Sequence, residues 1–207
     1  GVEMEPRQVR SAADARAIVE ERGVNHVKVG AFDIDGIMRG KYISRDKFLS
    51  SLDGGFGFCD VVLGWDCQDQ LYDNVKYTGW HSGYPDAPVR LLPDTCRLLP
   101  FEDNGLFFLG EFSPPAETVC PRGLLRRVLE RGRAMGFEAY AGFEYEFFVF
   151  KETPESVREK NYRDLTPMAP GWFGYSVIRN STGNAFYRQL LDHCRDMDIA
   201  IEGLHEE

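Results

Sequence analysis

The sequence lacks the features that would define a disulfide-stapled, membrane-spanning or nucleic-acid-binding protein. Its five cysteines are an odd set without a C-x-x-C pair, which argues against a disulfide framework and against a zinc knuckle. No apolar run approaches the roughly 18–20 residues of a membrane span, and the N-terminus has no signal-peptide core. Basic residues are outnumbered, 24 against 33 acidic, and the net charge of −9 disfavours nucleic-acid binding. We therefore expect a soluble, cytoplasmic protein with reduced thiols.

The length and one proline pair indicate the domain organisation. At 207 residues, the chain can bury a sizeable core in one large or two small domains. Pro114 and Pro115 form the clearest break, because a residue that precedes proline disfavours helix. We therefore predict two parts, residues 1–113 and 114–207, in an α+β protein.

Punctuating residues define the elements of the first part. A serine cap and a glycine stop predict a helix over 11–22, and an Asp-Gly pair predicts a hairpin turn between strands over 27–32 and 37–43. These patterns indicate a small mixed sheet with flanking helices. The other predicted elements are a helix over 44–52, loops over 54–57 and 73–90, and strands near 61–63, 89–92, 95–99 and 106–112.

The second part reads as the opening βαβ-like pieces of another domain. A proline at position 121 suits a helix start, and a basic amphipathic pattern continues to a glycine at 136. The predicted elements are a helix over 123–135, strands over 137–140 and 143–150, a helix over 184–197 and a last strand over 199–207.

Glu144 and Glu146 lie two positions apart within a run of aromatic and β-branched residues. In a strand they share one face, with Cα atoms about 7 Å apart. Two bare carboxylates there repel by about 2 kcal/mol at an effective dielectric constant of about 20, and desolvation adds to the cost. A divalent cation cancels both penalties, so we interpret the pair as a metal site. The competing interpretation is the solvent-facing side of an edge strand.

The C-terminal residues carry a second set of possible ligands. Alternation places His205 and Glu207 on one face of an extended tail, with Glu202 and Glu206 opposite. A carboxylate and an imidazole at this spacing suit an oxygen-rich site for Mg²⁺ or Mn²⁺. A charged tail of this kind is also typical of a solvated chain end.

Five segments together resemble the glutamine synthetase superfamily, particularly the γ-glutamylpolyamine synthetase-like branch, which joins glutamate to amines other than ammonia. A D-x-x-G-x-x-R-G-K pattern and a P-R-x-x-L…G-x-E-x-E-F-F pattern are moderately specific singly and strong in this order and spacing. The resemblance covers residues 15–207. The segments that carry it are residues 32–41, 92–97, 120–125, 142–148 and 202–207.

The resemblance implies a β-grasp N-terminal domain, followed by the beginning of a catalytic α/β domain, in an ATP-dependent ligase. It further implies a hexamer or dodecamer ring with sites between subunits, each using two Mg²⁺ or Mn²⁺ ions. Glu146 and Glu207 match ligands of the ion nearer the glutamate carboxylate, and Glu144 matches a ligand of the ion that grips the ATP phosphates. Glu206 is adjacent to Glu207, and a slip of one residue would exchange them. Metal ions would neutralise the charge of phosphoryl transfer to the γ-carboxylate of glutamate, and an amine would then attack the γ-glutamyl phosphate.

The chain departs from the ammonia-using members around Asp66. Those members carry Asp-Gly-Ser-Ser, and this chain has Asp-Cys-Gln-Asp over residues 66–69. In the family, this aspartate comes from a neighbouring subunit and helps to bind and deprotonate ammonium, so Asp66 is the catalytic candidate. Asp69 adds negative charge and Trp65 an aromatic face for a larger cation, which favours a polyamine, ethanolamine or another primary amine over ammonia. The alternative is a loop turn with local Asx-type hydrogen bonds.

The family continues well beyond the position that matches Glu207, so we expect these residues alone to hold only part of the site and to be inactive. Two other interpretations remain. A non-catalytic structural or assembly member of the superfamily would keep the fold without the chemistry. An amine-sensing module would bind a polyamine through residues 1–113.

Overall fold

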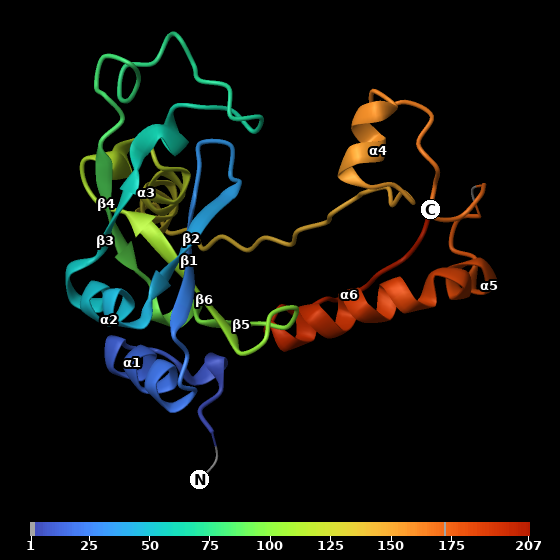
Figure 1. The fold of residues 1–207 in the computed structure, drawn as a ribbon, viewed down its shortest axis with the longest axis horizontal. Coiled ribbons are helices and arrows are strands. Elements are labelled where there is room, and N and C mark those ends of the chain that lie inside the picture. The colour runs from blue at the N-terminus through green and yellow to red at the C-terminus, as the bar shows by residue number, and fades with distance from the viewer. Residues whose placement is uncertain (1–2, 172) are drawn as a thin grey trace. The chain divides into compact units, whose positions relative to one another are not determined.

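The computed structural model describes residues 3–171 and 173–207. It divides into two compact units, residues 1–139 and 140–207, which are described separately (Figure 1). The domain boundary expected between residues 113 and 114 stays a prediction. The class is mixed α+β, as predicted.

The described part of the first unit contains a six-stranded mixed sheet with the order β2-β1-β6-β4-β3. β1 pairs antiparallel with β2 and parallel with β6, and β5 pairs with the first half of β6. Nearly every residue of β6 is buried, as expected for a central strand. The strands are β1 (His26–Phe32), β2 (Met38–Ser44), β3 (Phe56–Cys59), β4 (Asp86–Leu91), β5 (Arg97–Leu99) and β6 (Gly105–Phe112).

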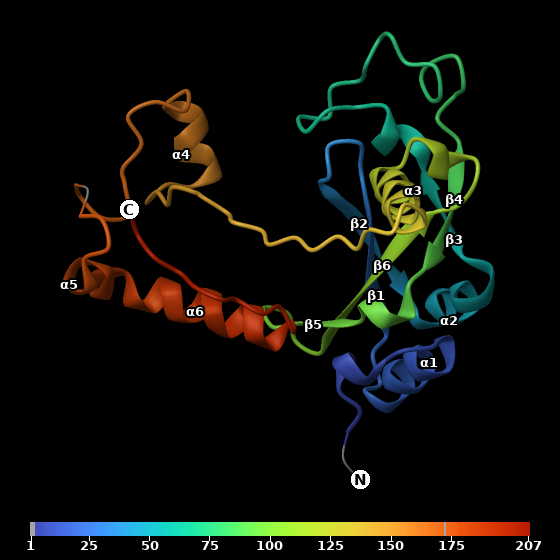
Figure 2. The same ribbon diagram turned by 180° about the vertical axis from the view of Figure 1, so that it is seen from behind.

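Local capping explains the first two helices, α1 (Ala12–Glu21) and α2 (Arg45–Gly54). The Ser11 side chain accepts a hydrogen bond from the Asp14 backbone N–H, and the Asp14 carboxylate accepts one from the Ser11 N–H in return. Both views show α1 and α2 at one end of the sheet and the long segment between β3 and β4 at the other (Figures 1 and 2).

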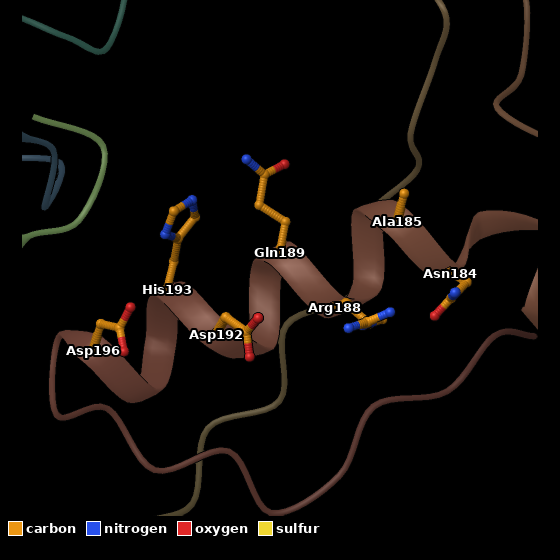
Figure 3. A pocket seen from close by; sticks show the side chains of 7 residues that line it. All are labelled: Asn184, Ala185, Arg188, Gln189, Asp192, His193 and Asp196. Atoms are coloured by element: carbon orange, nitrogen blue, oxygen red, sulfur yellow. The ribbon is translucent and has the colours of Figure 1, made fainter.

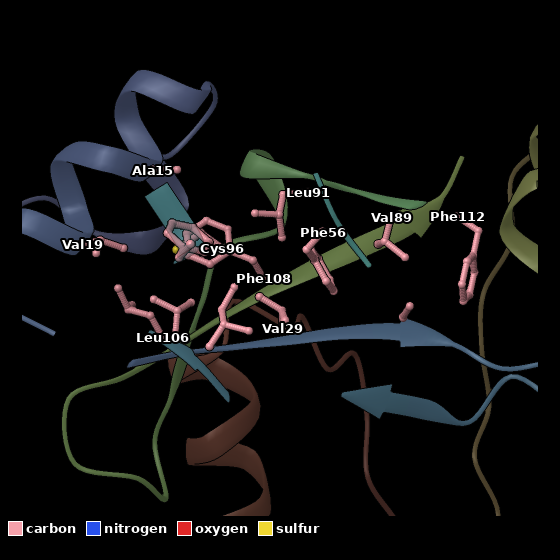
Figure 4. Close-up of a cluster of buried hydrophobic side chains, with 14 of the residues drawn as sticks. Ala15, Val19, Val29, Phe56, Val89, Leu91, Cys96, Leu106, Phe108 and Phe112 are labelled. Carbon is pink, nitrogen blue, oxygen red and sulfur yellow. The ribbon is translucent and has the colours of Figure 1, made fainter. Parts of the chain in front are cut away.

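One hydrophobic core fills the first unit (Figure 4). The side chains of Phe48 on α2 and Phe108 on β6 are fully buried, with ring centroids 4.7 Å apart. Fully or almost fully buried aliphatic and aromatic residues from both helices and the sheet surround them, among them Ile18, Val19, Val27, Val29, Val89, Leu106 and Phe112.

A buried carboxylate joins α3 (Pro121–Ala134) to the sheet. Glu111 on β6 is 2% exposed and lies 2.7 Å from Arg90 Nη2 and 3.3 Å from Arg122 Nε, and it also accepts a hydrogen bond from Arg126. Burial alone would raise the pKa of Glu111, but the hydrogen bond from Arg90 and the charge of Arg126 outweigh it and leave the pKa lowered.

The described part of the second unit consists of helices, turns and extended segments. Its helices are α4 (Pro154–Glu159), α5 (Val177–Asn180) and α6 (Asn184–Asp196). Phe186, Leu190, Cys194 and Met197 are half-buried on one side of α6, as the sequence pattern predicts. Short 3-10 helices elsewhere are η1 (Pro6–Gln8), η2 (Asp60–Leu63), η3 (Pro93–Thr95), η4 (Ala116–Thr118) and η5 (Ser181–Gly183).

The first unit corrects three predictions. Residues 86–88 of the loop predicted over 73–90 belong to β4, which begins at Asp86. Residues 61–63, predicted as a strand, form part of η2, because Gly64 N–H turns back to the Val61 carbonyl at 2.8 Å. Residues 54–57 are not wholly a loop, since β3 begins at Phe56 and pairs antiparallel with β4. Apolar and glycine-rich patterns express local preferences only, and pairing within the sheet determines which residues form strands.

The second unit corrects the predicted strands over 143–150 and 199–207, and residues 137–140 also lie outside any strand. Within the described residues these segments have no ladder partner beyond an isolated bridge between Phe150 and Pro167. A strand needs its backbone groups paired across a ladder, so an apolar pattern alone does not produce one.

The described part of the chain contains no helix long and apolar enough to cross a membrane.

Candidate functional site

Tyr175 organises the C-terminal tail. Its hydroxyl donates a hydrogen bond to Glu207 Oε1 at 3.2 Å, and its backbone N–H donates to the Glu206 carbonyl at 2.8 Å. Its ring stacks on His205, with ring centroids 4.9 Å apart and planes 14° from parallel. His205 Nε2 lies 3.4 Å from Glu207 Oε1. His205 and Glu207 therefore share one side of the tail, as alternation predicts.

Glu206 points to a different partner. It accepts a hydrogen bond from the Tyr187 hydroxyl on α6. Burial and this hydrogen bond raise the pKa of Tyr187 to about 12. Since adjacent residues of an extended chain face opposite sides, anchoring Glu206 on Tyr187 directs Glu207 toward Tyr175. The structure thus separates the two glutamates that the sequence alone left exchangeable by a slip of one residue.

Glu144 lies in the same neighbourhood. The hydrogen bond to Glu207 and the negative charges of Glu207 and Glu144 raise the pKa of Tyr175 above its ordinary value. Glu207 contacts this phenol directly, whereas Glu144 acts on it only through its charge, and that effect is the smallest of the causes. No sequence pattern indicates Tyr175, because 32 residues separate it from Glu207 and no spacing rule links them.

Glu144 and Glu146 do not lie on the half-buried strand that the sequence predicts. Both glutamates are exposed, and so are the neighbouring Phe143 and Tyr145. Exposed carboxylates are solvated, so the desolvation cost that called for a cation does not arise here. Among the described residues, no hydrogen bond or ion pair joins Glu146 to Tyr175 or Glu207. The metal roles of Glu144, Glu146 and Glu207 therefore stay predictions that rest on the motif match.

The donor chemistry of this neighbourhood fits a hard divalent cation, but the geometry assembles only part of a site. Carboxylate oxygens and one imidazole are ligands that suit Mg²⁺ or Mn²⁺. Among the described residues, however, no group of three or more histidine, cysteine or acidic side chains lies close enough together to hold a metal ion. Glu144, Glu146 and Glu207 stay the predicted ligands, and His205 Nε2 lies beside Glu207 on this side of the tail.

Asp66, the catalytic candidate, lies in a tight loop of the first unit. Its Oδ1 accepts hydrogen bonds from the backbone N–H groups of Gln68 at 2.8 Å and Gln70 at 3.0 Å. An isolated bridge between Trp65 and Leu71 closes the loop. This is the Asx-type turn that the sequence analysis kept as the alternative. The turn occupies Oδ1 of Asp66, so Oδ2 stays available for the predicted catalytic role.

The aromatic and acidic neighbours of Asp66 have an internal partner. Arg39 on β2 lies over the Trp65 ring at 4.8 Å and places its Nη1 2.7 Å from Asp69 Oδ1. The sequence predicts that the Trp65 ring and the Asp69 carboxylate contact an external amine. In the structure, the guanidinium of Arg39 contacts both of them.

A shallow hollow over α6 contains none of the predicted site residues (Figure 3). All its lining side chains come from this helix and line up along it, so it is an exposed helix face and not a convergent site. They are Asn184, Ala185, Arg188, Gln189, Asp192, His193 and Asp196.

Comparison with known proteins decides the family. Residues 118–207, which include the exposed acidic pair and the tail around Tyr175, match the model of the glutamine synthetase catalytic domain. The chain belongs to the glutamine synthetase superfamily. The superfamily match confirms the resemblance seen in the sequence motifs, and it includes the segment that carries Glu144, Glu146 and Glu207.

Relatives within the superfamily include ligases for amines. The chain is 41% identical to type-1 glutamine synthetase 2 of Dictyostelium discoideum over 87% of its own length and 35% of the relative. It is 30% identical to a glutamate–isopropylamine ligase of Pseudomonas over 93% of its length and 43% of the relative. It is 28% identical to a γ-glutamylethanolamide synthetase of Streptomyces coelicolor, with 94% and 43% covered. The chain thus spans well under half the length of these relatives.

Solved structures support the fold. A GmaS/ADP complex superposes with a TM-score of 0.58 at 14% identity, and covers 88% of this chain and 38% of its own. A glutamine synthase homologue superposes with a TM-score of 0.56 at 17% identity, over 89% and 41%. At these identities the likeness concerns the fold alone.

Proposed function

We propose that this chain is part of an ATP-dependent ligase that joins the γ-carboxylate of glutamate to an amine through γ-glutamyl phosphate. The observation that carries the proposal is the hydrogen bond from Tyr175 that orients Glu207, within the segment that matches the catalytic domain of the superfamily. Amine ligases among the relatives support the same reaction class.

The residues of this chain have distinct tasks in that reaction. Tyr175 and Tyr187 hold the tail so that Glu207 faces Tyr175 while Glu206 is turned to α6. When bound, two Mg²⁺ or Mn²⁺ ions would neutralise the phosphates and the carboxylate that react. We assign Glu146 and Glu207 to the ion at glutamate, and Glu144 to the ion at the ATP phosphates.

Asp66 is the proposed proton acceptor. An amine attacks an acyl phosphate only as its free base, so a carboxylate within reach of the incoming ammonium group speeds the step by removing a proton. Asp66 is half-buried, and its Oδ1 is fixed by two backbone N–H groups, which leaves Oδ2 for this task.

We propose that the acceptor is a primary amine or a polyamine and not ammonia. The relatives named for isopropylamine and ethanolamide support a primary amine. The Asp-Cys-Gln-Asp sequence, which replaces the Asp-Gly-Ser-Ser of ammonia-using members, supports the departure from ammonium.

The proposal extends to architecture. We propose a β-grasp arrangement for residues 1–113, supported by the β1–β2 hairpin, the helix α2 that follows it and the parallel pairing of β1 with β6. We further propose that the protein forms a cytoplasmic hexamer or dodecamer ring, in which Asp66 serves the site of a neighbouring subunit. We also propose that the domain boundary lies between residues 113 and 114.

The test is phosphate release from ATP by the intact protein with glutamate, Mn²⁺ and a panel of amines that includes isopropylamine, ethanolamine, 1,4-diaminobutane and ammonia. We expect release that depends on glutamate, metal and a primary amine together. Absence of release with every amine would contradict the proposal. Calorimetry that also detects no Mn²⁺ binding would point to the non-catalytic assembly member.

A further inference from the structure

Arg39 is the most extensively paired cation near the Asp66 loop. Its Nε lies 2.9 Å from Asp33 Oδ2, its Nη1 lies 2.7 Å from Asp69 Oδ1, and its guanidinium covers the Trp65 ring at 4.8 Å. Arg39 precedes Trp65 by 26 residues and Asp69 by 30 residues along the chain. One side chain therefore ties the loop to the sheet.

The sheet side of this tie is rigid. Asp33 is fully buried, and its Oδ1 accepts the backbone N–H groups of Asp35 at 2.9 Å and Ile37 at 2.8 Å, so only Oδ2 remains for Arg39. A carboxylate fixed by two backbone donors cannot rotate away from its partner. The guanidinium of Arg39 is consequently held in one position relative to the hairpin.

The conformation of the loop around Asp66 depends on this fixed guanidinium. Asp69 adopts a left-handed backbone conformation with φ of 61°, and its N–H donates to the Asp66 carbonyl at 3.0 Å. Ion pairing of Asp69 with Arg39, together with Trp65 under the guanidinium, fixes both flanks of Asp66. A planar fork can contact two carboxylates and a ring face together, which a lysine ammonium cannot do in the same geometry.

We infer that Arg39 is a positioning residue that occupies the cation site formed by Trp65 and Asp69, and that it thereby leaves Asp66 alone to receive a singly charged amine. This inference rests on the proposed function. With Arg39 in place, the loop offers an incoming amine one carboxylate. Without it, Trp65 and Asp69 are released and can hold a second cationic group, as in a diamine.

The experiment compares three variants of the intact protein, Arg39→Gln, Asp69→Asn and Asp73→Asn. Asparagine tolerates the left-handed conformation of Asp69, so this variant removes the charge without straining the turn. Asp73 is exposed and lies just beyond the loop, which makes it the matched control for loss of an aspartate charge. Two properties are measured: hydrogen exchange of the Gln68 and Gln70 amides, and kcat/KM for 1,4-diaminobutane relative to butylamine.

We expect Arg39→Gln to speed exchange of both amides by about tenfold or more and to raise the diamine-to-monoamine ratio by about tenfold. Asp69→Asn should speed exchange without raising the ratio, because the acidic group that would hold the second ammonium is gone. Asp73→Asn should match the wild type in both.

Exchange in Arg39→Gln equal to that in Asp73→Asn would overturn the positioning role. A rise of the diamine-to-monoamine ratio in Asp69→Asn equal to that in Arg39→Gln would overturn the role of Arg39 in selectivity. If Arg39→Gln does not fold, exchange in Asp69→Asn decides the positioning role. If the wild type turns over no amine, the proposed function fails, and the exchange measurements still decide whether Arg39 holds the loop.

Discussion

At the scale of single residues, two tyrosines distinguish two adjacent glutamates that the acidic motif alone does not distinguish. Glu206 and Glu207 are chemically identical neighbours, and only their partners distinguish them. Tyr187 takes Glu206, and Tyr175 takes Glu207. The identity of the predicted metal ligand thus depends on residues that lie far from the tail in the sequence.

Tyr187→Phe tests this arrangement by titration. Because the folded pKa of about 12 lies above the ordinary value near 10, the stability that Tyr187 contributes is complete below about pH 10 and is lost as pH rises through 12. We expect the difference in tyrosinate absorbance between wild type and variant to show a midpoint near pH 12. A midpoint near pH 10 would mean that Tyr187 is neither buried nor paired with Glu206.

Glu207→Gln tests the ligand assignment. Loss of one carboxylate should weaken Mn²⁺ binding by the intact protein by at least about tenfold, measured by calorimetry. Glu202→Gln is the matched control, since Glu202 is exposed in the same tail. Equal loss in both variants would indicate a general effect of tail charge and would contradict a specific role for Glu207.

At the scale of elements, buried or clustered charge fixes helices and loops in place. Glu111 brings Arg90 of β4 and Arg122 and Arg126 of α3 to one point on β6. Glu152 does the same for the segment around α4, where it accepts hydrogen bonds from Lys160, Ser156 and the Thr166 backbone.

Glu111→Gln should loosen α3 on the sheet. Removing one partner from a buried ionic cluster leaves guanidinium groups without their counter-charge, so we expect the free energy of unfolding in urea to fall by about 3 kcal/mol. Because the folded pKa is lowered, the contribution is present above the unfolded pKa and is lost as pH falls through the folded one. A variant whose stability matches the wild type at pH 7 would contradict this role.

Glu152→Gln should release the segment that ends at Thr166. The hydrogen bond from Lys160, with those from Ser156 and Thr166, lowers the pKa of Glu152 to about 2. Its contribution is therefore present above the ordinary pKa and lost as pH falls toward 2. Hydrogen exchange of the Thr166 amide at pH 7 should be faster in the variant. Unchanged exchange would show that another group holds the segment.

Several elements were predictable because their causes are local. Ser11 and Gly23 set the ends of α1, and the turn before Gly36 set the β1–β2 hairpin. The segment 143–150 failed as a strand because pairing needs a second segment, and none in the described part of this unit supplies it. The contacts of Arg39 could not be predicted from the sequence for a related reason. Its partners are 6 to 30 residues away, and no spacing rule joins a hairpin strand to a distant loop.

At the scale of the whole molecule, the two units carry different parts of one proposed chemistry. The first unit holds Asp66 in a loop tied to its sheet by Arg39, and the second holds Glu207 and Glu144 near Tyr175. The proposed ligase reaction would use both parts, and the chain covers 35–43% of the relatives named above. The proposal is therefore tested best on the intact protein.

Identification of the product is the most direct test. The intact protein is incubated with ATP, Mn²⁺, glutamate and equal concentrations of isopropylamine and ammonium, and the products are separated by mass spectrometry. The account predicts γ-glutamylisopropylamide as the main product, formed with stoichiometric ADP and phosphate. Glutamine as the main product, or no γ-glutamyl amide at all, would contradict it.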